Sequence, residues 1–260
     1  PPRSTLDRSS AASDVYKRQQ LYHHNCQGPV GQKRSLHVQT GSEIHESVLT
    51  MLFLDRLGAE TVLMAPNIDQ MHVINHYTGQ EMDEYRNVLV ESARIARGSI
   101  KDMAEIQGDD LSALIIPGGL GASKNLSDFA MSGPECSVNP DVYRIVVEMI
   151  LAKKPIGAIC IAPAIMAKIL AEQSLSAKLT IGNDKTTSED IVAMGSKHQN
   201  CSTEEIVIDN ENKIVTTPAY MNAESISEAA KGIEKLVDQI VSMVKSVSYT
   251  HLTLPTSDLV

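Results

Sequence analysis

The chain has 260 residues, 42% of them hydrophobic, which suffices for a substantial core and excludes a disordered chain. It carries 23 Lys and Arg against 32 Asp and Glu, a net charge of −9 and no Trp, so a nucleic-acid-binding surface is not expected. No apolar stretch approaches the length of a bilayer span. The four cysteines are too widely spaced for a disulfide framework or a zinc knuckle. The composition therefore favours a protein with reduced thiols that binds a small molecule or another protein.

The two ends of the chain differ from the rest. Residues 1–19 have no hydrophobic period, and SSAASDVYKRQ at 9–19 and VSYTHLTLPT at 247–256 resemble the translated strands of one sequencing adapter. We therefore expect adapter-derived tails at both ends, with ordinary disordered tails as the alternative. Residues 20–40 lack the apolar run of a buried parallel strand, so a first strand there is missing or garbled, or the segment is a natural loop.

Helix and strand patterns alternate from Gly41 onward. Ser42 is a candidate N-cap, and apolar residues recur at helical spacing from Ile44 until Gly58 ends the helix. In chain order there follow a strand at 61–65, a helix at 87–97, a strand at 111–116, a helix at 142–151, a strand at 155–160, a helix at 163–171, strands at 206–208 and 213–216, and a helix at 223–244. This alternation predicts a single α/β domain over 41–246 with a mostly parallel sheet covered on both faces.

The predicted strand at 111–116 runs directly into a loop with the sequence Pro117-Gly118-Gly119-Leu120-Gly121. Glycines permit positive φ and a close approach of backbone N–H groups to a ligand, so the loop suits an anion or an oxyanion. It is neither a GxGxxG pattern nor followed by GK[ST], so it gives little support for nucleotide binding. A tight turn without a binding role is the plainer alternative.

A cysteine stands where the strand at 155–160 turns at once into a helix, in the segment GAICIAP that contains Cys160. This is the arrangement of a nucleophile elbow, with cysteine in place of serine. The helix dipole is expected to lower the pKa of the thiol. The N–H of Ile161 and an N–H of the glycine loop would then form an oxyanion hole. The alternative is an inert core cysteine.

An attacking thiol needs a proton acceptor. Glu43 and Glu46 lie at the start of the first helix, on the same sheet edge as Cys160 if the crossover connections are right-handed. Either carboxylate could approach the sulfur, and the alternative for each is a capping carboxylate. His198 is the other candidate base, with a surface-loop histidine as its alternative.

Other histidines are less informative. His45 is expected on the surface of the first helix. His72 and His76 have the spacing of a metal-binding pair, but no HExxH pattern or third ligand accompanies them. The prediction is that the chain holds no metal.

Six segments of the chain carry a family resemblance: GSEIHESVLTML, VINHYTGQ, RNVLVESARIARG, IIPGGLGASKNLSDFA, KPIGAICIAPA and KIVTTPAYM. They resemble the ElbB-like family, named for enhancing lycopene biosynthesis, within the ThiJ/PfpI and class I glutamine amidotransferase-like superfamily. The similarity covers about residues 41–244. It implies a flavodoxin-like α/β sandwich that is often dimeric. The site residues that it implies are Cys160 as nucleophile, Glu43 or Glu46 beside it, and Gly118, Gly119 and Gly121 near the oxyanion.

The resemblance implies a cysteine-dependent, cofactor-free glyoxalase that converts glyoxal-type dicarbonyls to hydroxy acids, and the family name suggests a link to isoprenoid biosynthesis. Ile161 stands where true amidotransferases have a histidine, so glutamine hydrolysis is not expected. The family's usual first strand and Gly-Cys-Gly-type turn are missing from 20–40. Two alternatives remain: a non-catalytic stress- or redox-responsive protein with an oxidisable Cys160, and a scaffold that binds a metabolite or a partner protein. We expect a homodimer in the cytoplasm, with mitochondria as the alternative location.

Overall fold

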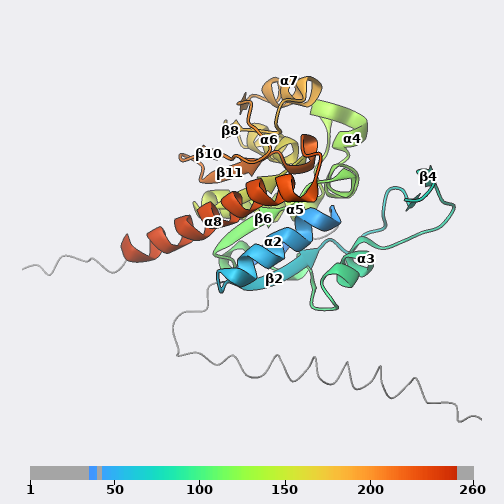
Figure 1. Cartoon of the computed structure of the whole chain (residues 1–260), viewed down its shortest axis with the longest axis horizontal. Helices are drawn as coiled ribbons and strands as arrows, with labels where there is room; N and C mark the ends of the chain where they lie inside the picture. The colour runs from blue at the N-terminus through green and yellow to red at the C-terminus, as the bar shows by residue number, and fades with distance from the viewer. Residues whose placement is uncertain (1–34, 40–42, 251–260) are drawn as a thin grey trace, which may run out of the picture. The chain divides into compact units, whose positions relative to one another are not determined.

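A seven-stranded sheet forms the centre of the computed structural model, which describes residues 35–39 and 43–250, with side chains over 43–246. The strand order is β10-β11-β7-β6-β1-β2-β5 (Figure 1). The strands are β1 (Ser35–Gln39), β2 (Glu60–Ala65), β5 (Lys101–Asp102), β6 (Ala113–Ile116), β7 (Ile156–Ile159), β10 (Val207–Asp209) and β11 (Ile214–Thr217). All neighbouring pairs are parallel except β10 with β11. The predicted mostly parallel α/β sheet is therefore confirmed.

The strand β1 corrects one expectation. It lies between β2 and β6 and pairs with both in parallel, so that Val38 stands opposite Leu63 and Ile115. The expectation that 20–40 lacks a first strand is therefore wrong for its last part. Pairing along both edges satisfies the backbone N–H and C=O groups of a central strand whatever the polarity of its side chains, so a short SLHVQ segment suffices.

Helices cover both faces of the sheet. On one face α2 (Ile44–Arg56) packs beside α8 (Ile226–Thr250), which crosses β6, β7 and β11 (Figure 1). On the other face lie α5 (Pro140–Leu151) and α6 (Ala162–Glu172). Two further helices, α3 (Val88–Ile95) and α7 (Lys185–Ala193), pack against β2 and α6 respectively. The predicted two-sided cover of the sheet is thus present.

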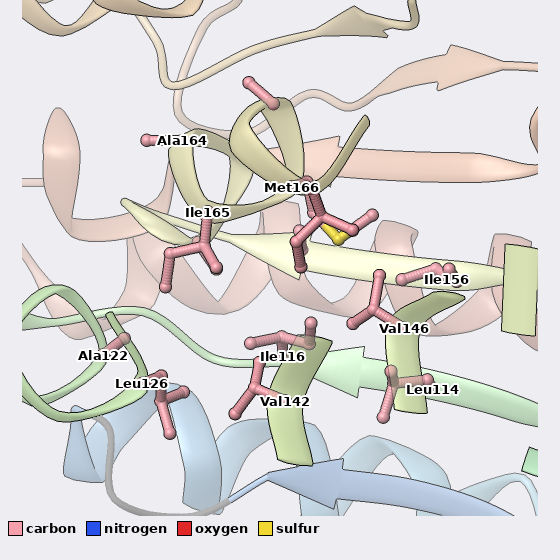
Figure 2. Packing of buried hydrophobic residues seen from close by; sticks show 14 of the residues in the cluster. Leu114, Ile116, Ala122, Leu126, Val142, Val146, Ile156, Ala164, Ile165 and Met166 are labelled. Atoms are coloured by element: carbon pink, nitrogen blue, oxygen red, sulfur yellow. The ribbon is translucent and has the colours of Figure 1, made fainter. Parts of the chain in front are cut away.

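The core forms two layers, one on each face. Leu114 and Ile116 point into the layer beneath α5 and α6, while Ala113 and Ile115 point into the layer beneath α2 and α8. Figure 2 shows side chains of β6, β7, α5, α6 and the 122–126 segment meeting in the first layer. Burying one Leu or Ile side chain contributes about 1.5–3 kcal/mol, so these layers are what fix the ends of β6 and β7 in place.

The shorter elements were not predicted from the sequence. They are the strand pairs β3 (Ile74–Asn75) with β4 (Gln80–Glu81) and β8 (Lys178–Leu179) with β9 (Lys197–His198), the helix α4 (Phe129–Ser132), the π-helical η3 (Ala122–Leu126), and the 3₁₀ turns η1 (Met103–Glu105), η2 (Gly108–Asp110), η4 (Gly133–Glu135) and η5 (Ala219–Met221). Two to five residues are too few to show a hydrophobic period. The helix α7 was also missed, because only Ile191 of its nine residues is buried.

The ends of two helices differ from the prediction. Helix α2 is capped by Glu43 and not by Ser42. Helix α8 continues to Thr250, beyond the predicted end at Val244. Of the two predicted adapter-derived tails, residues 1–19 and 251–260 lie outside the described residues, whereas residues 247–250 continue helix α8. No helix within the described ranges is long and apolar enough to cross a membrane.

Candidate active site

Cys160 lies at the sharp turn between β7 and α6. Its backbone has a φ of 60°, a conformation that costs energy for a residue with a side chain, and its N–H donates to the carbonyl of Thr217 on β11 at 2.9 Å. Helix α6 begins at Ala162, with Pro163 in its first turn. The cysteine is only 5% exposed. This is the strained strand-to-helix turn that an elbow nucleophile occupies.

The glycine loop after β6 packs directly against this turn. A Cβ on Gly118 would lie 2.6 Å from the Cβ of Cys160, so only glycine fits there. Gly119 has a φ of 86°, and a Cβ on it would lie 2.7 Å from the Cβ of Glu43. Gly121 instead has an ordinary helical backbone, with a φ of −62°, at the start of η3. The close approach expected of the loop therefore depends on Gly118 and Gly119.

Glu46 is the carboxylate that meets the cysteine. It is fully buried, and its Oε2 accepts a hydrogen bond from the N–H of Gly118 at 2.7 Å. Its Oε1 accepts no hydrogen bond of ordinary geometry from the described residues. Burial raises the pKa of Glu46 from 4.5 to about 7, and the N–H of Gly118, the Cys160 thiol and the N–H of Tyr220 oppose that rise. A buried carboxyl that titrates near neutral pH is a suitable general base.

The pKa of Cys160 contradicts the sequence-based expectation of a lowered value. Burial raises the pKa of the thiol well above its usual range, and the neighbouring Glu46 raises it further. The N–H groups of Gly119 and Ile161 act on the sulfur in the opposite direction but do not compensate. The expectation of a lowered pKa included the effect of the helix dipole but not the desolvation of the buried thiol. In this site the proton rests on sulfur, and Glu46 is placed to remove it.

The other two candidate bases have different contacts. The Oε2 of Glu43 accepts the N–H of Glu46 at 2.7 Å, which caps α2. His198 lies on β9, where its Nε2 accepts the N–H of Ile181 at 3.3 Å. No interaction of His198 with the cysteine or with Glu46 occurs in the described part of the chain. The structure thus brings Glu46 to the sulfur.

A pair of side chains beside the elbow was missed. Tyr220 belongs to η5, directly after β11, and its hydroxyl lies 2.8 Å from Nδ1 of His45. That nitrogen is 3.9 Å from Oε1 of Glu43. Burial, and then the charges of Glu43 and Glu46, raise the pKa of Tyr220. The available signal was the position of Tyr220 after a strand, at the same sheet edge as Cys160.

The remaining histidines and cysteines are not part of the site formed by Cys160 and Glu46. Nδ1 of His72 is 3.4 Å from Nζ of Lys124, and His76 is exposed. Within residues 43–246, no group of three or more His, Cys, Asp and Glu side chains is arranged to hold a metal ion. Burial raises the pKa of Cys136 to about 11, and Cys201 is half-buried.

The raised pKa of Glu46 predicts a pH dependence of stability. A carboxyl that is harder to ionise in the folded state stabilises the fold below pH 4.5, and this stability is lost as pH rises through about 7. The loss amounts to about 3 kcal/mol for a shift of this size. In urea unfolding at pH 5 and pH 8, Glu46→Gln should therefore gain stability relative to the parent at the higher pH. An equal difference at both pH values would contradict the assignment.

The sheet, the cysteine elbow, the glycine loop and the buried glutamate define a class I glutamine amidotransferase-like domain, and its fold is that of the DJ-1/ThiJ/PfpI proteins. Drosophila melanogaster DJ-1beta has the same fold, with a TM-score of 0.51 at 17% identity, covering 86% of this chain and 100% of that chain. A closer solved structure is an isoprenoid biosynthesis protein with amidotransferase-like domain from Ehrlichia chaffeensis. It has a TM-score of 0.74 at 36% identity and covers 80% of this chain and 99% of that chain.

Sequence relatives give the family. The chain is 42% identical over 216 residues to human glutamine amidotransferase-like class 1 domain-containing protein 3, mitochondrial, covering 79% of each. It is 41% identical to the ES1 protein homolog, mitochondrial, of Rattus norvegicus, covering 79% of this chain and 80% of that protein. No family model matches the chain. The chain belongs to the glutamine amidotransferase-like class 1, or ES1, family, and its relatives' names give no support to the predicted cytoplasmic location.

Proposed function

We propose that the protein is a cysteine-dependent, cofactor-independent glyoxalase that converts small dicarbonyls to hydroxy acids. The observation that carries this proposal is the buried Glu46 carboxyl beside the Cys160 thiol. A nucleophile with an adjacent base in a site shielded from water is the arrangement that covalent catalysis at a carbonyl requires. The N–H groups of Gly119 and Ile161, which act on the sulfur, support it further.

The first step is addition. The sulfur of Cys160 attacks one aldehyde carbon of glyoxal, a C–S bond forms, and Glu46 takes the thiol proton. The electron pair of the C=O bond moves to oxygen, where the N–H groups of Gly119 and Ile161 stabilise it. Glu46 then gives the thiol proton to that oxygen, which yields a hemithioacetal and leaves the carboxylate free to act again. Because Glu46 removes the proton as the bond forms, the resting thiol does not have to be ionised.

The second step moves hydrogen between carbons. Glu46 removes the proton of the hemithioacetal carbon while the electron pair of the neighbouring C=O moves to its oxygen, giving an enediolate. Glu46 then returns the proton to the neighbouring carbon, and the hydroxyl proton of the first carbon passes to the second oxygen, giving a thioester of glycolate. One carbon is oxidised and the other is reduced, so no external oxidant is needed. Water then cleaves the C–S bond, which releases glycolate and restores the Cys160 thiol.

Two properties of Cys160 favour catalysis over a redox-sensing role. Peroxide reacts with thiolates that are exposed, whereas this residue is 5% exposed and its pKa is raised. Oxidation is therefore the weaker of the two proposals.

The test is product formation without any added cofactor. We expect proton NMR to show glyoxal replaced by glycolate in the presence of the protein, one for one, since the reaction adds only water. Aldehyde loss without glycolate, as in simple thiol adduct formation, would contradict the proposal. A heat-denatured sample at equal thiol concentration is the control.

The setting of the activity is also proposed. The relatives' names support a mitochondrial location, and the description of the Ehrlichia protein supports a link to isoprenoid biosynthesis. We propose a homodimer as well, which light scattering would register as twice 28.2 kDa.

A further inference from the structure

A hollow of about 760 Å³ opens among the segments that follow three of the strands. It is lined by Asn183, Asn200, Cys201, Ser202, Thr203, Met221 and Asn222. These residues follow β8, β9 and β11 in the chain. In open α/β sheets, ligands bind in crevices beyond the carboxyl ends of the strands, so the location itself suits a ligand.

The hollow is one strand away from the nucleophile. Strand β11 pairs with β7, and the carbonyl of Thr217 accepts the N–H of Cys160. Four residues beyond Thr217, Met221 lines the hollow and also packs against the core cluster that contains Cys160. The N–H of the residue before it, Tyr220, acts on the Glu46 carboxyl and lowers its pKa. The hollow and the reacting groups therefore share the segment that follows β11.

The lining is polar but carries no charge. Five of its seven residues bear amide or hydroxyl side chains. Two lysines are paired with the glutamates that follow the lining residue Thr203: Lys231 with Glu204 at 2.6 Å, and Lys235 with Glu205 at 2.5 Å. Glu205 and Lys235 also shift the pKa of Cys201 in opposite directions. An anionic ligand would lose water there without gaining a counter-charge, whereas hydroxyl groups would find donors and acceptors.

One amide of the hollow is held in place. The Oδ1 of Asn222 accepts the N–H of Asn183 at 3.4 Å. Gly182 lies against this side chain with a φ of 94°, and a Cβ at Gly182 would overlap Asn222 Oδ1. The absence of a side chain at Gly182 thus leaves room for the Asn222 amide, which is positioned before any ligand arrives.

We propose that this hollow is a second subsite, which holds the neutral hydroxylated chain of a 2-oxoaldehyde while its aldehyde carbon reacts at Cys160. The claim that the aldehyde carbon reacts at Cys160 rests on the proposed function. The claim that the hollow prefers uncharged polyhydroxylated chains rests on the lining residues alone.

The kinetic test compares two substrates. We expect Asn222→Ala to lower the ratio of kcat/KM for a six-carbon hydroxylated 2-oxoaldehyde over kcat/KM for glyoxal about tenfold, the effect of about 1.4 kcal/mol of lost binding. Ser202→Ala should act in the same direction. Asn210→Ala, at an exposed turn outside the hollow, should leave the ratio unchanged. An unchanged ratio in both hollow variants would overturn the subsite.

The binding test needs no turnover, because Cys201 is a reporter within the hollow. In Cys160→Ser protein, a six-carbon alditol should slow alkylation of Cys201 at least threefold, measured on its peptide by mass spectrometry with buried Cys136 as reference. The aldonate of equal length should not protect. Equal protection by the aldonate, or none by the alditol, would overturn the proposal. Protection by the alditol in a protein that does not consume glyoxal would contradict the proposed function alone.

Discussion

Cys160→Ser is expected to lower kcat/KM for glyoxal by about three orders of magnitude. A serine hydroxyl is far less acidic than a thiol, so a base whose pKa is about 7 does not ionise it. Serine is close to cysteine in size and keeps the hydrogen bond from N–H 160 to Thr217, so the elbow should fold. Glycolate formation followed by NMR measures the loss.

A second cysteine provides the matched control. Cys136 is buried in the layer beneath α5 and α6, away from Glu46 and the glycine loop, and its pKa is also raised by burial. Cys136→Ala should cost some stability through the small cavity but keep kcat/KM within about threefold of the parent. Glyoxal consumption by Cys160→Ser at more than a tenth of the parental rate would refute the role of the sulfur.

Glu46→Gln is expected to lower kcat for glyoxal by about 10²- to 10⁴-fold, the usual contribution of a general acid–base group. The glutamine Oε1 can still accept the N–H of Gly118, so the substitution removes the proton acceptor while keeping the contact. In the parent, kcat/KM should rise with pH through about 7, as Glu46 loses its proton, and this inflection should vanish in the variant. Steady-state rates between pH 5 and pH 9 test both statements.

Glu43→Gln is the comparison that separates the two carboxylates. Glu43 accepts the N–H of Glu46 and caps α2, so its amide variant should lose up to about 1 kcal/mol of stability and little activity. A larger loss of kcat in Glu43→Gln than in Glu46→Gln would show that Glu46 is not the general base. Thermal unfolding of both variants shows whether the rates refer to folded protein.

The fold was predictable where the chain has long periodic segments. The amphipathic helices α5 and α8 and the apolar strands β6 and β7 overlap their predicted ranges, because a buried parallel strand and a half-buried helix differ in period. Strand β1 was missed since its pairing on both sides, and not its own pattern, makes it a strand. The polar helix α7 was missed for a related reason, because it buries little.

The site was predictable in its location and only partly in its chemistry. Cys160 and the glycine loop both follow strands, so parallel topology brings them to one edge. The choice between Glu43 and Glu46 depends on which of them takes the cap, and the two residues are only three positions apart at the start of α2. Burial sets the direction of the Cys160 pKa, and burial results from packing between segments distant in sequence. The contact of His45 with Tyr220, 175 residues away, has the same origin.

The position of β1 between β2 and β6 has a mechanical consequence for the acid–base pair. Helix α2 begins soon after β1 ends, so the alignment of β1 along its neighbours sets how far Glu46 reaches toward β7. Sliding this strand by one residue would translate its end by about 3.3 Å, enough to separate the carboxyl from the thiol. The register of β1 thus sets the position of Glu46 relative to Cys160. An insertion or deletion ahead of Gln39 that altered this register would abolish the proposed reaction without changing any reacting residue.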